Sequence, residues 1–201
     1  SLIGLPAKKI IRISGNHLEI TDQGKMVESK EIEDPLVFIE NYQKKFHIIE
    51  TEGLPKFNGG LVGYFGYDCV RYIEPRLKDS QPTDTLGTPD ALFMVSEEVA
   101  VFDNLKNKLF LVVLVDSNSE EQKRLAEIRL DDLEKQLQSP LSDQVLMQPK
   151  QPIVESDFVS SFGENEFKAS VRKVKEYIYS GDVMQVVGSQ RMSIPFTADP
   201  V

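Results

Sequence analysis

The chain has 201 residues, of which 32 are Asp or Glu and 23 are Lys or Arg, so its formal net charge is −9 at pH 7. Forty per cent of the residues are apolar, which excludes an intrinsically disordered chain. The net negative charge argues against binding to nucleic acid, because phosphate contacts need clustered Lys and Arg. The longest apolar run, 109–115, is far shorter than the roughly 18 residues that a membrane span needs, so we expect no membrane association.

The cysteine content indicates a reducing compartment. Cys69 is the single cysteine, so the chain cannot form an intrachain disulfide. The first nine residues lack the long apolar region of a secretory signal. We therefore expect a cytoplasmic protein.

The N-terminal part alternates short extended runs with turns. Residues 8–14, 17–21 and 25–32 are predicted strands, and tight turns with Gly15 and Gly24 separate them. This pattern predicts an antiparallel meander. A helix is predicted from Asp34-Pro35 to about residue 46, since Asp caps helices and Pro suits the first helical position.

A glycine-rich apolar segment follows at 59–69 (GGLVGYFGYDC). Glycines inside a strand often mark close approach of another backbone, so this segment is predicted to be a buried strand with a neighbour packed against its glycines. A turn or short helix is expected at 71–76, and an exposed loop at 78–89.

The middle of the chain predicts a hairpin and a helix. Residues 90–102 and 109–116 are the predicted strands of the hairpin, and 120–138 is an amphipathic helix. The stretch 138–151 is polar and proline-containing, which indicates a linker. We therefore expect an N-terminal domain at 1–150 and the start of a second at 151–201.

The C-terminal part begins a second structural unit. Ser161 and Glu164 have the spacing of a capping box before a helix that ends at Gly181, and 183–196 is a predicted long strand. The fold class is α+β, with antiparallel sheets and packed helices. One helix and one strand cannot build their own core, so we expect the chain to be a piece of a longer protein.

The residues alone give no complete catalytic constellation. His17 and His47 lie on separate elements without metal-site spacing, and Cys69 is expected to be a buried, inert thiol. The glycines do not have dinucleotide-site spacing, and no phosphate-binding loop or nucleophile elbow is present. The acidic pairs on the predicted helix 120–138 are interpreted as solvated charge.

Two passages nevertheless resemble a known family. They are 57–68 (FNGGLVGYFGYD), continuing to RYIE at 71–74, and 181–192 (GDVMQVVGSQRM). Both are similar to the large subunit of anthranilate synthase (component I), a chorismate-using enzyme of tryptophan biosynthesis. The resemblance covers essentially the whole chain. It implies the family's N-terminal domain, without its first segment, followed by a truncated start of its chorismate-binding domain.

The resemblance implies a reaction and its partners. The family converts chorismate and ammonia to anthranilate and pyruvate with Mg²⁺, which acts as a Lewis acid. A glutaminase subunit supplies the ammonia, and tryptophan is the feedback inhibitor. Because the family's metal ligands and most catalytic groups lie further along its chain, we expect these 201 residues alone to be inactive and to hold no metal.

Gln185 is the candidate site residue. Relatives that add water to chorismate have Lys at this position, where it can act as a base toward water. Gln has no titratable proton, so it suits a site whose nucleophile is ammonia. Ser189 and Arg191 are expected on the same strand face, with a structural role.

Two alternatives remain. One is the large subunit of aminodeoxychorismate synthase of folate synthesis, which often reads Gln-Val-Asn where this chain has Gln185-Val186-Val187. The other is a stand-alone regulatory or ligand-binding module without catalysis. The product of the complete enzyme separates the first alternative, and independent effector binding would support the second.

Overall fold

The computed structural model describes every residue except 48, 50–51, 81–82, 141–151 and 197–201. The chain divides into two compact units, Ser1–Ser139 and Pro140–Val201. Most of the linker predicted at 138–151 lies outside the described residues.

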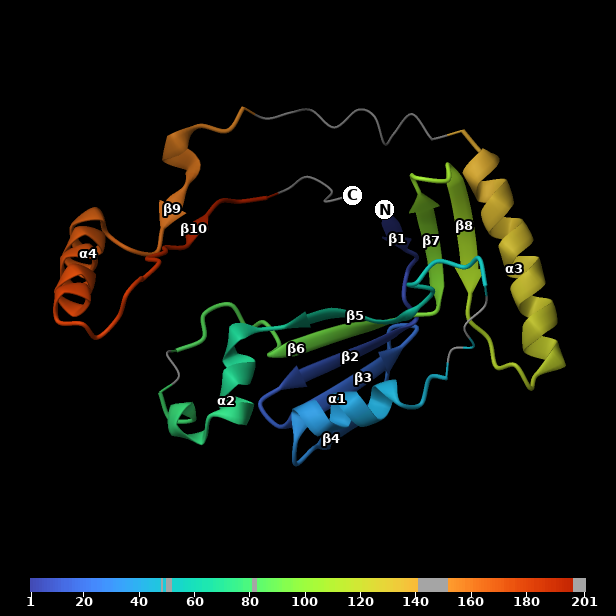
Figure 1. Cartoon of the computed structure of the whole chain (residues 1–201), viewed down its shortest axis with the longest axis horizontal. Coiled ribbons are helices and arrows are strands. Elements are labelled where there is room, and N and C mark those ends of the chain that lie inside the picture. The colour runs from blue at the N-terminus through green and yellow to red at the C-terminus, as the bar shows by residue number, and fades with distance from the viewer. Residues whose placement is uncertain (48, 50–51, 81–82, 141–151, 197–201) are drawn as a thin grey trace. The chain divides into compact units, whose positions relative to one another are not determined.

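A five-stranded antiparallel sheet organises the first unit, in the strand order β4-β3-β2-β6-β5 (Figure 1). The predicted meander is confirmed, because β2 pairs with β3 and β3 pairs with β4. The strands are β2 (Lys9–Ser14), β3 (His17–Asp22), β4 (Lys25–Glu31), β5 (Gly60–Phe65) and β6 (Ala91–Ser96).

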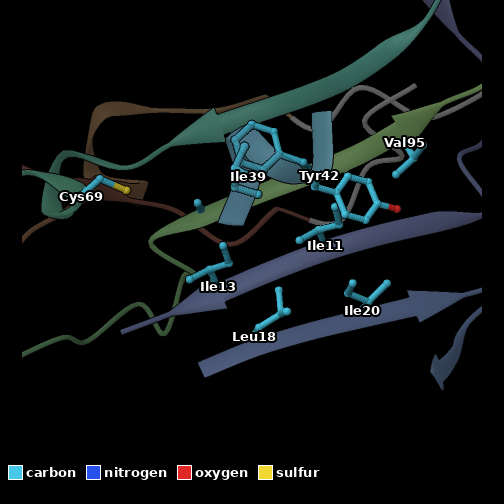
Figure 2. Packing of buried hydrophobic residues seen from close by; sticks show 10 residues of the cluster. Ile11, Ile13, Leu18, Ile20, Ile39, Tyr42, Cys69 and Val95 are labelled. Carbon is cyan, nitrogen blue, oxygen red and sulfur yellow. The ribbon is translucent and has the colours of Figure 1, made fainter. Parts of the chain in front are cut away.

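Helix α1 (Pro35–Gln43) covers one face of this sheet and closes the core between them (Figures 1 and 2). The Asp34 carboxylate accepts the backbone N–H groups of Leu36 and Val37 at 2.9 and 3.1 Å, as the predicted cap requires. The buried side chains of the core are Ile11, Ile13, Leu18, Ile20, Ile39, Tyr42, Cys69, Ala91, Phe93 and Val95.

The glycine-rich segment differs from its prediction in one respect. β5 is an edge strand with half-exposed side chains, not a buried strand; Phe65, for example, is 52% exposed. The predicted close approach is confirmed, since a Cβ at Gly63 would overlap the carbonyl oxygen of Leu92 on β6. A Cβ at Gly59 would likewise overlap the Leu114 side chain. Gly59 and Gly63 therefore mark a close neighbour on one side of the strand and do not indicate that both of its sides are buried.

Short helical turns follow β5, as expected for this stretch. They are η1 (Tyr67–Cys69), α2 (Val70–Ile73) and η2 (Pro75–Leu77). The Arg71 guanidinium donates to Asp68 Oδ1 at 2.8 and 3.1 Å and to the carbonyl oxygen of Leu77 at 2.5 Å. One arginine thus joins the first and last of these turns.

A second, three-stranded sheet has the order β1-β7-β8. Its strands are β1 (Leu2–Gly4), β7 (Glu98–Asp103) and β8 (Lys108–Val113), followed by α3 (Glu120–Gln138). The hairpin and the helix are confirmed. The single strand predicted at 90–102 is wrong, because β6 and β7 belong to different sheets. The inside–outside alternation breaks where Val95 and Ser96 are both buried, which marks the change of sheet.

The second unit contains η4 (Glu155–Asp157), β9 (Val159–Ser160), α4 (Glu164–Tyr179) and β10 (Met192–Ser193). The predicted helix is confirmed, with Gly181 at φ +80° beyond its end. Its predicted capping box is wrong: Gly163 precedes the helix, and its N–H donates to the Glu166 carboxylate at 3.0 Å.

The long strand predicted at 183–196 is also wrong. Only the two residues of β10 pair, antiparallel to β9. A strand needs a neighbour for its backbone hydrogen bonds, and β9 provides one for two residues alone. The rest of 183–196 favours an extended conformation by its sequence, but it has no strand to pair with among the described residues and is therefore irregular.

Candidate functional site

The candidate residue Gln185 lies in an exposed, irregular connection between α4 and β10. This connection is anchored at both ends. The Asp182 N–H donates to the carbonyl oxygen of Tyr177 at 3.0 Å, and the Ser161 N–H donates to the carbonyl oxygen of Arg191 at 2.9 Å. Ser160 Oγ also lies 2.8 Å from Gln190 Oε1. The anchors fix the ends of the connection and leave Gln185 in solvent.

Gln185, Ser189 and Arg191 do not share a strand face. The described structure has no regular strand between Tyr179 and Met192, so the alternation on which that expectation rested is absent. Gln185 is exposed and carries an uncharged amide. Both properties suit contact with a molecule outside this unit. The expectation that these three residues are aligned is therefore corrected, whereas the role of Gln185 stays a prediction.

Asp90 is the most connected polar residue around the glycine-rich segment. Its Oδ2 accepts the Gly15 N–H at 2.7 Å and lies 2.8 Å from the Tyr72 hydroxyl. Its backbone oxygen accepts the Gly66 N–H at 2.6 Å and the Cys69 thiol at 3.1 Å. Asp90 thereby joins the β2–β3 turn, the end of β5 and the short helices to the start of β6.

Two side chains of this cluster, the Tyr72 phenol and the Cys69 thiol, have raised pKa values. Burial raises the pKa of Tyr72, and its hydrogen bond to Asp90 raises it further. Burial likewise raises the pKa of the Cys69 thiol, and the negative charge of Asp90 adds to that effect. A buried thiol that holds its proton is a poor nucleophile, which agrees with the inert interpretation of Cys69.

Sequence reasoning missed this cluster. Its members are separated by up to 75 residues, and only the fold brings them together. The one local signal was an acidic residue directly before a strand. The hydrogen bonds of the Asp90 cluster hold the glycine-rich segment in place, and we assign the cluster no catalytic role.

A shallow groove of about 540 Å³ runs between the three-stranded sheet and α3. The Arg129 guanidinium in this groove donates to Glu98 Oε2 at 2.9 and 3.0 Å. That hydrogen bond raises the pKa of Arg129 above its ordinary value. Because these two charges satisfy each other, we assign the groove no catalytic role.

The described residues contain no cluster of three or more His, Cys, Asp or Glu side chains able to hold a metal ion. His17 instead contacts Glu31 at 2.9 Å and Ser29 at 3.2 Å on the sheet surface. The residues present therefore do not fit a Mg²⁺ site, and we derive no step through the metal. Among the described helices, none is long and apolar enough to cross a membrane.

Comparison with known proteins identifies the family. The sequence profile of the chorismate binding enzymes matches residues 7–201. The chain belongs to the chorismate binding enzyme family. This agrees with the resemblance inferred from the two glycine-containing passages.

Anthranilate synthase component 1 of Pseudomonas putida is 46% identical over the whole chain, which covers 41% of that protein. The protein of the same name from Pseudomonas aeruginosa is 41% identical, with the same coverage of both. The crystal structure of anthranilate synthase component I from Streptococcus pneumoniae matches with a TM-score of 0.75 and 28% identity, over 100% of this chain and 42% of that one. The chain thus spans about two fifths of the length of the curated relatives it matches.

Proposed function

We propose that these residues form the N-terminal part of an anthranilate synthase component 1, which converts chorismate and ammonia to anthranilate and pyruvate. The observation that carries the proposal is the match to relatives of that name along the whole chain. The α+β fold with antiparallel sheets agrees with the matching solved structure. The first unit serves as a scaffold, and the second begins the catalytic domain.

Gln185 is the residue of this chain that we place at the active site of the complete enzyme. Its amide can orient a neutral nucleophile by hydrogen bonding and cannot remove a proton from water at neutral pH. Its exposed position between two anchored ends is compatible with contact to the rest of that enzyme. The backbone of Arg191 holds one end of the same connection through Ser161, and we propose a structural role for Ser189 as well.

The remaining functional groups belong to the complete enzyme. Mg²⁺ would supply Lewis-acid stabilisation of developing charge there, through ligands outside these residues. We also propose a glutaminase component as the source of ammonia, tryptophan as the feedback inhibitor, and a cytoplasmic location. Within this chain, Gln185-Val186-Val187 favours the tryptophan branch, because the folate-branch family often has Asn where this chain has Val187.

The complete gene product tests the proposal. We expect it to form anthranilate from chorismate, ammonium and Mg²⁺, detected by the fluorescence of the product, and we expect residues 1–201 alone to give none. Aminodeoxychorismate as the product would favour the folate-branch alternative. Turnover by residues 1–201 alone would show that the catalytic groups are placed wrongly.

A further inference from the structure

Helix α3 has two sides of different character. Its inner side packs against β8 and contains the buried Leu133 (Figure 1). A second set of residues recurs at intervals of four and three along the exposed side, which places them on one stripe of the helix. The stripe consists of Glu121, Leu125, Ile128, Asp132 and Lys135.

The middle of this stripe is apolar and slightly hollow. Leu125 and Ile128 are 49% and 53% exposed. A shallow hollow of about 460 Å³ lies beside them. Its other lining residues are Arg129, Asp131, Asp132 and Lys135. Neighbouring apolar side chains surrounded by charged ones have the arrangement of a contact site, with an apolar centre and a polar rim.

The charges along the stripe are antisymmetric about Ile128. On its N-terminal side, Glu121 precedes Arg124 by three residues, and on its C-terminal side Asp132 precedes Lys135 by three. In an antiparallel copy that crosses at Ile128, Glu121 faces Lys135. Arg124 faces Asp132 in the same arrangement. Opposite charges meet at both positions, so the stripe is complementary to a reversed copy of itself.

The end charges of the stripe are free for such contacts. Neither Glu121 nor Lys135 takes part in the ion pairs that α3 makes within the described residues. Both residues are exposed. Asp132, in contrast, already accepts a hydrogen bond from Arg129 at 2.7 Å. The facing Glu121 and Lys135 side chains therefore carry the charge argument.

We propose that this stripe is a self-association surface, on which a second copy of the chain places its own α3 antiparallel, across a twofold axis at Ile128. Leu125 of each copy then faces the hollow beside Ile128 of the other. A pair between Glu121 and Lys135 closes each end of the contact. A twofold contact uses the same patch on both copies, which is what a self-complementary stripe provides.

The size of the surface sets the strength of the association. One helix face per copy is small for a protein interface, and each copy carries a net charge of −9. The dimer is therefore weak and depends on protein concentration. A different protein partner would need complementarity only to its own surface, so it would not require the sign reversal about Ile128.

Disulfide trapping in the complete gene product tests the position of the axis. Helices pack with axes about 8–10 Å apart, which brings facing Cα atoms close enough for a disulfide. Mild oxidation of Ile128→Cys should give a covalent dimer in non-reducing electrophoresis. Glu127→Cys, which points about 100° away around the helix, is the matched control and should stay monomeric. The parent protein is the blank for all other cysteines, including the buried Cys69.

Charge exchange tests the pairing. Sedimentation equilibrium of the complete gene product should show that Glu121→Lys or Lys135→Glu weakens the dimer about tenfold, because two pairs change from attraction to repulsion. The double variant should recover the affinity of the parent, since opposite charges face each other again. Circular dichroism should give the same helix content for all variants, because both positions are exposed.

Four results would overturn the proposal. They are equal trapping at positions 127 and 128, a double variant that stays as weak as the single ones, a gene product that is monomeric at all concentrations, and a dimer that forms only with another protein added. Protection of Ile128→Cys from thiol reagents in a monomer would show that the rest of the polypeptide covers the stripe instead. Anthranilate formation is independent of all these outcomes.

Discussion

At the residue scale, Gly63 shows how one position permits the approach of two strands. A Cβ there would meet the backbone of Leu92, which cannot rotate away as a side chain can. We expect Gly63→Ala to lower the free energy of unfolding by about 2 kcal/mol or more, measured by urea denaturation. Gly4→Ala is the matched control, because a Cβ at that strand glycine meets nothing within 4 Å. Equal midpoints for both variants would contradict this packing.

Tyr72 gives a prediction for alkaline pH. Its pKa is raised in the folded chain, so the native state holds this proton more tightly than the unfolded state. The resulting stabilisation is fully present below about pH 10, the ordinary tyrosine pKa, and is lost as pH rises above it. The stability difference between the parent chain and Tyr72→Phe should therefore stay constant in neutral solution and shrink above about pH 10.

Urea denaturation over a series of pH values measures this difference. Lysines also titrate in the alkaline range, but their contribution is common to the parent chain and Tyr72→Phe and cancels in the comparison. A difference that grows with alkaline pH would show that the phenol is not held protonated by burial and Asp90.

Gln185 is tested by exchanging its amide for an ammonium. In the complete gene product, we expect Gln185→Lys to lower ammonia-dependent anthranilate formation, because it places a charged, titratable group where a neutral one orients the nucleophile. Gln43→Lys, the same change at the exposed end of α1, should leave the rate unchanged. Unchanged kinetics for Gln185→Lys would remove this residue from the site.

At the element scale, the helices were predictable because their signals are local. Asp34-Pro35 marks the start of α1, and the apolar spacing in 164–179 with Gly181 beyond it marks α4. The meander was predictable for the same reason, since short turns fix the pairing of β2, β3 and β4.

The wrong predictions concern elements that depend on distant partners. The stretch 183–196 has strand composition but no ladder partner beyond β9. The glycine-rich β5 was expected to be buried and is an edge strand instead. Burial and strand length are set by which elements lie alongside, and sequence spacing does not contain that information. The prediction of the candidate site failed for the same reason. The expected alignment of Gln185 with Ser189 and Arg191 required the long strand predicted at 183–196.

The link between α3 and the three-stranded sheet gives an element-scale prediction. The Arg129–Glu98 pair joins α3 to β7, and the Arg129 side chain is about one third exposed at 34%. Solvent weakens such a pair, so Arg129→Gln should cost only about 1 kcal/mol of unfolding free energy in urea denaturation. Arg124→Gln on the same helix should cost less, and the reverse order would contradict the assigned contact.

At the scale of the whole molecule, the first unit has a well-packed core, and each unit exposes some surfaces when its described residues are taken by themselves. The core under α1 is closed, whereas the opposite sheet face, the β5 edge and the connection containing Gln185 are open. Family membership and the greater length of the relatives give these open features one explanation. We propose that they are the places at which this scaffold joins the rest of a larger enzyme.

Transfer of labelled nitrogen is the sharpest test of the proposed reaction. The complete gene product would be incubated with chorismate, ¹⁵N-ammonium and Mg²⁺. The reaction products would then be separated and their masses measured by mass spectrometry. The proposed reaction gives anthranilate carrying one ¹⁵N, together with pyruvate. Labelled aminodeoxychorismate, an unlabelled hydroxylated product, or unchanged chorismate would contradict it.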